Sequence, residues 1–350
     1  MQETKLKKQL EQQLFEQMSF LELTRQHPNQ IEQSMSHQLD DGSVAELWDT
    51  GVLYFKPADN AAITNQHALV ISSGVHGNET APIEIVDNLV RSILSGELKV
   101  LQPVLFIIGN PVAMNESKRF IHENMNRLFC GKHRLYDHDE AKRAAYLEGY
   151  LQRFFDLHPT TLRYHYDLHT AIRGSKYKKF AIYPFQDGKD WNKEQLAFLL
   201  SSGIDTILLG HQPAGTFSYF SSHFFNAHAF TVELGKVMPF GQNEMENFQK
   251  ISDNLAKLIA NETIEMKPFN HQNFNLFRVK EELLKSEDPN YKLNVSSDAL
   301  NFSDFPKGFK LTEDYLGGYT TENEGEAIVF PNLAVPAGQR AGLVVVRAEI

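Results

Sequence analysis

The stretch ALVISSGVHGNETAP, residues 68–82, contains an apolar run, a loop with two glycines and a proline in close succession. Residues 68–71 form an apolar run too short for a buried helix, so they predict a strand. Pro82 predicts the first turn of a helix that extends to about residue 95. A strand that leads through a short loop into a helix is the beginning of an α/β unit.

The same alternation of strand-like and helical stretches continues to about residue 265. Further strands are expected at 104–108, 164–168, 180–183, 206–209 and 228–233, and helices at 139–155, 192–202 and 243–261. Upstream, residues 33–56 alternate and turn at Asp41-Gly42, which predicts a strand pair that leads into the same domain. The sequence therefore predicts the α/β class, with a mixed β-sheet covered by helices on both faces.

The two ends of the chain differ from this pattern. Leucines and a methionine at helical spacing predict an amphipathic helix over residues 3–25, which we interpret as a packing element. After about residue 268 the sequence changes to short strands with Gly, Asn, Asp and Pro turns. We therefore expect three parts: an N-terminal helix (1–30), the α/β domain (31–266) and a smaller, mostly-β C-terminal domain (267–350).

The composition narrows the class of protein. Hydrophobic residues make up 42% and charged residues 22% of the 350, which is typical of a globular protein with a sizeable core. The formal net charge of −10 argues against non-specific nucleic-acid binding. No apolar run reaches the length of a membrane span, and no secretory signal is visible. We expect a cytoplasmic protein, and the sequence leaves open whether it forms a homo-oligomer.

The cysteine content excludes two kinds of site. Cys130 is the single cysteine, so neither an intrachain disulfide nor a thiolate zinc cluster can form within one chain. We interpret Cys130 as a small buried or bystander residue rather than a nucleophile.

His76 and Glu79 are candidate metal ligands in the loop that follows the first strand of the α/β region. Ligands in open α/β sheets bind beyond the carboxyl ends of strands, so this loop has the right location. Two residues three apart, in a loop that contains Gly74 and Gly77, can direct both side chains toward one point. A catalytic zinc needs three protein ligands and one open position, and two histidines with a glutamate are a known set. The third ligand should be a distant histidine.

The segment YHYDLHT, residues 164–170, supplies that histidine. Strand alternation places His165, Asp167 and His169 on one face, and His169 is chosen because it ends the strand. Asp167 is either a carboxylate that orients the site or an ordinary hydrogen-bonded strand-end residue. We interpret His165 as a core histidine. From the spacing alone, a metal site and a merely polar loop both remain open.

Several segments of the chain are similar to motifs of one known family. They are Gly74–Thr80, Gly109-Asn110-Pro111, Arg119, Asn124-Met125-Asn126-Arg127, Asp167–Ser175 and Glu233-Leu234-Gly235-Lys236, in this order. The chain thus resembles the succinylglutamate desuccinylase/aspartoacylase branch of the zinc metallocarboxypeptidase superfamily, from about residue 45 to its end. The histidine loop and residues 233–243 resemble the desuccinylase side of this branch more than the aspartoacylase side.

The resemblance implies a role for each matching residue and one Zn²⁺ per chain. His76, Glu79 and His169 would hold the zinc, Glu233 would be the general base, and Arg119 would face the developing oxyanion. Asn126 and Arg127 would bind a substrate carboxylate, because a planar guanidinium can contact both of its oxygens. Arg173 or Lys236 would read the succinyl carboxylate that an acetyl group lacks.

The activity implied by the resemblance is zinc-dependent hydrolysis of N-succinyl-L-glutamate to succinate and L-glutamate, the last step of a bacterial route of arginine catabolism. The partner would be this small anionic substrate, with neither nucleic acid nor a membrane involved. The alternatives are an aspartoacylase-like enzyme for another N-acyl amino acid, a metallocarboxypeptidase, and a protein with a purely structural zinc. The last fits poorly, because structural zinc sites normally close all four positions.

Overall fold

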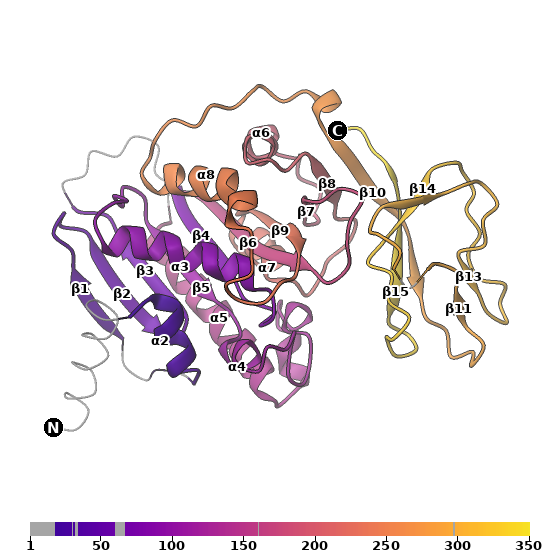
Figure 1. Cartoon of the computed structure of the whole chain (residues 1–350), viewed down its shortest axis with the longest axis horizontal. Coiled ribbons are helices and arrows are strands. Elements are labelled where there is room, and N and C mark those ends of the chain that lie inside the picture. The colour runs from indigo at the N-terminus through magenta and orange to yellow at the C-terminus, as the bar shows by residue number, and fades with distance from the viewer. Residues whose placement is uncertain (1–17, 30, 32–33, 60–66, 160, 297) are drawn as a thin grey trace.

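The structure, a computed structural model, describes residues 18–29, 31, 34–59, 67–159, 161–296 and 298–350. Most of its strands join one sheet of thirteen strands in the order β1-β2-β3-β5-β4-β6-β9-β7-β8-β10-β15-β14-β12 (Figure 1). These strands are β1 Met35–Gln38, β2 Val44–Asp49, β3 Val52–Lys56, β4 His67–Ser73, β5 Val104–Ile108, β6 Leu162–Ala171, β7 Phe180–Tyr183, β8 Thr206–Leu209, β9 His228–Lys236, β10 Asn275–Leu284, β12 Ser303–Phe305, β14 Glu326–Val329 and β15 Arg340–Arg347.

The centre of the sheet is parallel. Strand β4 pairs in parallel with β5 and β6, and β6 pairs in parallel with β9, whereas β3 and β7 are antiparallel to their central neighbours β5 and β9. All five residues of β5 are buried, as expected for a strand covered on both faces. The carboxyl ends of β4, β6 and β9 therefore meet at one edge of a mixed sheet.

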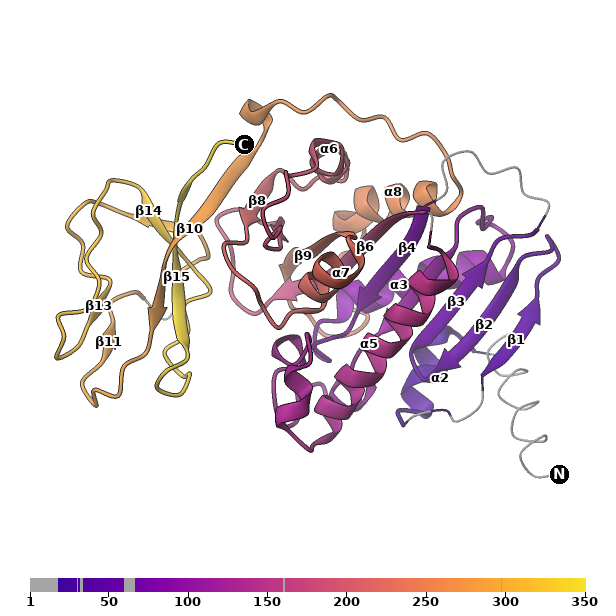
Figure 2. The same cartoon turned by 180° about the vertical axis from the view of Figure 1, so that it is seen from behind.

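Helices cover both faces of this sheet, as Figures 1 and 2 show from opposite sides. One core unites side chains of α2 (Phe20–Gln26), α3 (Thr80–Leu94), α6 (Lys193–Ser201) and α8 (Gln249–Ile259) with the strands. A second core contains α5 (Asp139–Leu157) and α7 (Phe217–Phe225). The predicted α/β class, with a mixed sheet between two helical layers, is confirmed.

Residues 33–56 contain one more strand than the predicted pair. A second turn at Gly51 separates β2 from β3, in addition to the turn at Asp41-Gly42. Gly51 has φ 63°, and a Cβ there would lie 2.4 Å from the carbonyl oxygen of Ile108. This close approach is a tertiary contact, which explains why periodicity along the chain did not reveal the turn.

Helix α7 was not predicted from the sequence. Its stretch FSYFSSHFF consists of aromatic and serine residues with modest helix propensity. The side chain of Thr216 caps its first turn by accepting from the amide of Tyr219, and Phe217 and Phe220 are buried in the second core. Tertiary packing and a cap therefore decide the helix. A short helix α4, Pro111–Asn115, was also missed.

The C-terminal segment is rich in strands, as expected, and forms a lobe at one end of the molecule (Figure 1). The main sheet continues into this lobe, because β10 pairs in parallel with β8 and antiparallel with β15. Strands β11 (Lys292–Leu293) and β13 (Thr312–Glu313) form a separate two-stranded sheet. The division at residue 266 stays a prediction, since one sheet crosses it.

The prediction of one continuous helix over residues 3–25 is wrong, because Ser19 is extended, with φ −74° and ψ 162°, and a separate helix begins after it. Helix α2 begins after Ser19, which forms a capping box with Glu22, and its buried residues Phe20 and Leu23 pack into the first core. The rest of the expected helix, residues 3–17, lies outside the described residues.

Candidate metal and active site

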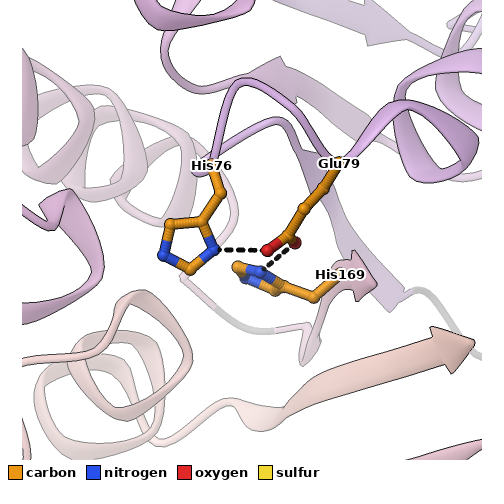
Figure 3. A group of neighbouring side chains, drawn as sticks. All are labelled: His76, Glu79 and His169. Atoms are coloured by element: carbon orange, nitrogen blue, oxygen red, sulfur yellow. Dashed lines mark hydrogen bonds and ion pairs between the residues drawn. The ribbon is translucent and has the colours of Figure 1, made fainter. Parts of the chain in front are cut away.

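His76, Glu79 and His169 lie together at the carboxyl ends of β4 and β6 (Figure 3). One ligand atom from each lies within 4.8 Å of the others, and all three residues are buried. His169 is distant from His76 and Glu79 in the sequence but close to them in space because β4 and β6 are parallel neighbours, with Ser72 opposite Asp167. The structure thus brings the three predicted ligands into one cluster.

Glycines shape the loop that carries His76 and Glu79. Gly74 has φ 63°, in the left-handed region that favours glycine. A Cβ on Gly77 would lie 2.1 Å from the backbone nitrogen of Met114, so the loop can approach α4 closely only with glycine there. The amide of Gly77 also donates to the carbonyl of Arg119 at 3.1 Å. These contacts hold the loop in the shape that directs both ligands inward.

The two histidines are oriented alike. His76 Nε2 lies 2.9 Å from Asn124 Oδ1, and His169 Nε2 lies 2.9 Å from Asp167 Oδ2. Their Nδ1 atoms face Glu79, at 2.8 Å from Oε1 for His76 and 2.9 Å from Oε2 for His169. His76 Nδ1 lies within ion-pair distance of Glu79, but this nitrogen has no hydrogen-bond partner among the described residues.

This donor set fits a zinc ion. Two imidazole nitrogens and a carboxylate converge, and a buried nitrogen without a hydrogen-bond partner is costly unless something else contacts it. The contact of Asp167 with His169 supports the first of the two interpretations that the sequence left open. Asp167 holds the outer nitrogen of a candidate ligand, which is the usual arrangement of a carboxylate behind a metal-bound histidine.

The charges around Glu79 favour a bound cation. Burial would raise the pKa of Glu79, but His76 and His169 hold it well below its ordinary value. Its Oε1 accepts from Arg119 Nη1 at 2.6 Å and its Oε2 from the amide of Thr170 at 3.0 Å. Burial lowers the pKa of His76 to about 4. Burial would lower the pKa of His169, but Asp167 and Glu79 hold it well above its ordinary value. The cluster therefore offers an ionised carboxylate and a neutral imidazole, and a metal would have to displace a proton from the second imidazole.

Glu233 lies beside the cluster on the neighbouring strand β9. It pairs in register with His169, and only 9% of its surface is exposed. Its Oε2 is buried without a hydrogen-bond partner among the described residues. Burial, followed by the charge of Glu79, raises its pKa to about 7. The site thus holds a second carboxylate that can exchange a proton near neutral pH.

Two of the predicted substrate residues occupy the segment after α4. Asn126 is buried, and its Oδ1 accepts from the amide of Phe217 at 2.9 Å, so this oxygen holds the start of α7. Arg127 is exposed, and its Nη1 donates to the carbonyl of Asn126 at 2.7 Å. Reduced hydration and then the charges of Arg340 and Arg119 lower the pKa of Arg127 to about 9. The charges of Glu282 and Glu123 act on Arg127 in the opposite direction.

The other two predicted substrate residues lie at strand ends. Arg173 follows β6 and is partly exposed. A hydrogen bond from Ser296 lowers the pKa of Asp298, and the charge of Arg173 contributes to the same shift. Lys236 is exposed at the end of β9. Their roles, like those of Asn126 and Arg127, stay predictions.

Three residues near the site received no role from the sequence. Asn124 holds His76, and the amide of Thr170 binds Glu79. Both stand inside motifs quoted above, so their proximity to the ligands was a usable signal. Arg340, at the start of β15, is far away in the sequence, and nothing in the sequence indicated that it lies near Arg127.

Cys130 behaves as expected of a bystander. Burial raises the pKa of its thiol to about 12, which disfavours the nucleophilic thiolate. None of the helices in the described part of the chain combines the length and apolar character that a bilayer span requires.

The mixed sheet between helical layers, with the buried cluster at its parallel strand ends, defines the zinc-carboxypeptidase-like class of fold. Residues 65–259 match the family model of the succinylglutamate desuccinylase/aspartoacylase catalytic domain, and residues 272–348 match that of the AstE/AspA barrel-sandwich hybrid domain. The chain belongs to the succinylglutamate desuccinylase/aspartoacylase family.

Individual relatives agree with this assignment. The chain is 45% identical to the succinylglutamate desuccinylase of Shewanella amazonensis, over 94% of this chain and 95% of the relative. The crystal structure of the enzyme of that name from Chromobacterium violaceum is similar with a TM-score of 0.82 and 38% identity, covering 95% of this chain and 98% of the other. Murine aminoacylase 3, at 16% identity, covers 82% of this chain and 97% of its own with a TM-score of 0.55, and shares the fold.

Proposed function

We infer that this protein hydrolyses N-succinyl-L-glutamate to succinate and L-glutamate and uses one zinc ion. The observation that carries the inference is the 45% identity to a succinylglutamate desuccinylase over nearly the full length of both chains. The convergent cluster of His76, Glu79 and His169 supports the metal-dependent part. A metabolic reaction on a small anion also favours a cytoplasmic location.

A zinc ion held by His76, Glu79 and His169 would supply an electrophile that acidifies water and polarises the amide carbonyl. Glu233 would accept a proton from the attacking water through Oε2, which has no hydrogen-bond partner within the described ranges. The water oxygen adds to the amide carbon, the carbon–nitrogen bond breaks, and Glu233 passes the proton to the leaving nitrogen. Succinate and glutamate are the two products.

Arg119 is proposed to stabilise the developing oxyanion. It lies within the site, because its Nη1 contacts Glu79 Oε1 at 2.6 Å, and 29% of its side chain is exposed. A well-placed donor to an oxyanion contributes about 3–4 kcal/mol to the transition state. Asn126 and Arg127 are proposed to bind a carboxylate of the substrate, together with the nearby positive charge of Arg340. A chain of net charge −10 needs such a local excess of cations to attract a substrate with three carboxylates.

The test is the release of succinate from N-succinyl-L-glutamate by the purified chain, measured before chelation, after chelation and after zinc is added back. We expect activity that chelation abolishes and zinc restores, with little activity on N-acetyl-L-aspartate. Greater activity on the acetyl substrate would instead support the aspartoacylase-like alternative. Activity that survives complete metal removal would contradict the proposed chemistry.

A further inference from the structure

A chain of buried polar side chains extends from the metal cluster into the core. Beyond Asp167, which contacts His169, the next member is Ser72 on β4, whose Oγ lies 2.6 Å from Asp167 Oδ1. His165 Nε2 lies 2.8 Å from the same Ser72 Oγ. His165 Nδ1 lies 2.6 Å from Ser221 Oγ on α7. Ser72, His165, Asp167 and Ser221 each have 0% exposed surface.

The chemistry of these groups sets the direction in which each hydrogen bond of this series of side chains is donated. An ionised carboxylate only accepts hydrogen bonds, so Ser72 donates its single proton to Asp167. Ser72 must then accept from His165, which places the proton of that ring on Nε2. Burial lowers the pKa of His165 to about 4, so the ring is neutral and its Nδ1 has a lone pair. Ser221 therefore donates to Nδ1.

The same direction holds on the other side of Asp167. Its Oδ2 accepts from Nε2 of His169, so Nδ1, which faces Glu79 at 2.9 Å, is the nitrogen that would bind a metal once its proton is displaced. The ring of His165 is itself held edge-on against Phe217, with 4.8 Å between the ring centroids. Strands β4 and β6 and helix α7 thus contribute to one hydrogen-bonded chain that ends at a candidate metal ligand.

We propose that Ser72, His165 and Ser221 are positioning residues that act through Asp167 to hold His169 in the tautomer and orientation that bind zinc. The proposal rests on the proposed function only in that the cluster holds zinc. Hydrogen-bonded chains in a water-free core polarise their members, so a link several bonds away still strengthens the contact of Asp167 with His169. If these residues had a purely structural role, removing any nearby buried hydroxyl should change zinc affinity by the same amount.

Ser218 provides the matched control for this distinction. It lies on the same helix as Ser221 and is also buried. Its Oγ pairs with Thr231 Oγ1 at 2.7 Å instead of with a member of the hydrogen-bonded chain of side chains. Ser72→Ala, Ser221→Ala and Ser218→Ala each remove one buried hydroxyl. Ser72→Thr keeps the hydroxyl and serves as the conservative variant.

The experiment measures the affinity of each metal-free variant for Zn²⁺ by competition with a chelator, and its melting temperature without metal. We expect Ser72→Ala to bind zinc about tenfold more weakly, at the low end of the effect of residues behind a metal ligand. Ser221→Ala should weaken binding less, while Ser218→Ala and Ser72→Thr should remain close to the parent. In steady-state kinetics kcat should fall while KM stays unchanged.

The proposal is overturned if Ser72→Ala binds zinc within twofold of the parent, or no more weakly than Ser218→Ala at a similar melting temperature. If Ser72→Ala does not fold, the comparison of Ser221→Ala with Ser218→Ala decides in the same way. The zinc measurement uses no substrate, so its result is independent of whether N-succinyl-L-glutamate is hydrolysed.

Discussion

His169 and Glu233 lie opposite each other in register on the parallel strands β6 and β9. Adjacent rigid strands therefore hold a candidate metal ligand and a buried carboxylate whose Oε2 has no hydrogen-bond partner in the described part of the chain. Hydrogen bonding between the two strands fixes their backbones, so the relative placement of the two side chains does not depend on a loop. This pairing is the basis of the first prediction.

Glu233→Gln should lower kcat by a factor of about 10²–10⁴, because an amide cannot accept the proton of the attacking water. Zinc content and melting temperature should stay near those of the parent, since the change is nearly isosteric and Glu233 is not a proposed ligand. Steady-state succinate release and metal analysis measure both effects. Glu46→Gln, on β2, is the control and should remain fully active. Activity of Glu233→Gln within a few-fold of the parent would contradict the role as base.

Asn124→Ala should weaken zinc binding by about 10–100-fold, because Asn124 holds the outer nitrogen of His76. The measurement is chelator competition on the metal-free variant. Asn115→Ala removes an exposed asparagine that contacts only Arg25 in the described hydrogen bonds, and it should leave zinc affinity unchanged. Equal zinc affinities for the two variants would show that Asn124 does not orient His76.

Arg173→Ala and Lys236→Ala test which cation reads the succinyl carboxylate. Replacing the responsible residue should lower the preference of the enzyme for N-succinyl over N-acetyl glutamate by about tenfold or more. Only the succinyl group has a carboxylate that this residue can bind. The ratio of kcat/KM for the two substrates measures this preference directly. An unchanged ratio in both variants would reject both residues and leave Arg340 as the next candidate.

Arg143→Met should reduce the free energy of unfolding by about 3–5 kcal/mol, the usual cost of leaving a buried charge without its partner. The guanidinium of Arg143 contacts Asp49 Oδ2 at 3.1 Å and donates to the carbonyls of Thr50 and Gly109 at 2.7 and 2.8 Å. Urea unfolding followed by circular dichroism measures the loss. The neighbouring Lys142→Met removes an exposed ion pair and should cost less than about 1 kcal/mol.

The hydrogen bonds of Glu326 predict how acid destabilises the C-terminal strands. Its buried carboxylate accepts from Lys280 Nζ and the Tyr319 hydroxyl, and although burial raises its pKa, these partners lower it to about 2. A folded pKa below the unfolded value of about 4.3 means that this stabilisation is complete above that pH and is lost as pH falls toward 2. Thermal melts from pH 7 to pH 3 test this.

The variant Glu326→Gln isolates that contribution. It should melt at a lower temperature than the parent at pH 7, and the difference should shrink as the pH falls below about 4.3, because the unfolded parent then binds a proton at Glu326 that the folded parent, with a pKa of about 2, does not bind. A difference that stays constant down to pH 3 would mean that other carboxylates cause the acid sensitivity.

The larger helices and strands of the α/β region were predictable because local periodicity determines them. Helices α3 and α5 and strand β5 agree with their predicted ranges to within about two residues. Helix α7 and the turn at Gly51 were not predictable, since aromatic packing and a close approach to Ile108 decide them. Both depend on residues far away in the sequence.

The sequence by itself determined the identity of the candidate ligands, because a glycine loop after a strand and a second histidine at a strand end are local patterns. Only the tertiary structure decided that His76, Glu79 and His169 meet, which nitrogens face inward, and that Asp167 holds His169. It also decided the partners of Asp167, which come from β4, β6 and α7. The physical reason is that hydrogen bonds and ligand geometry depend on distances of a few ångströms, and these are set by strand order and register rather than by local sequence.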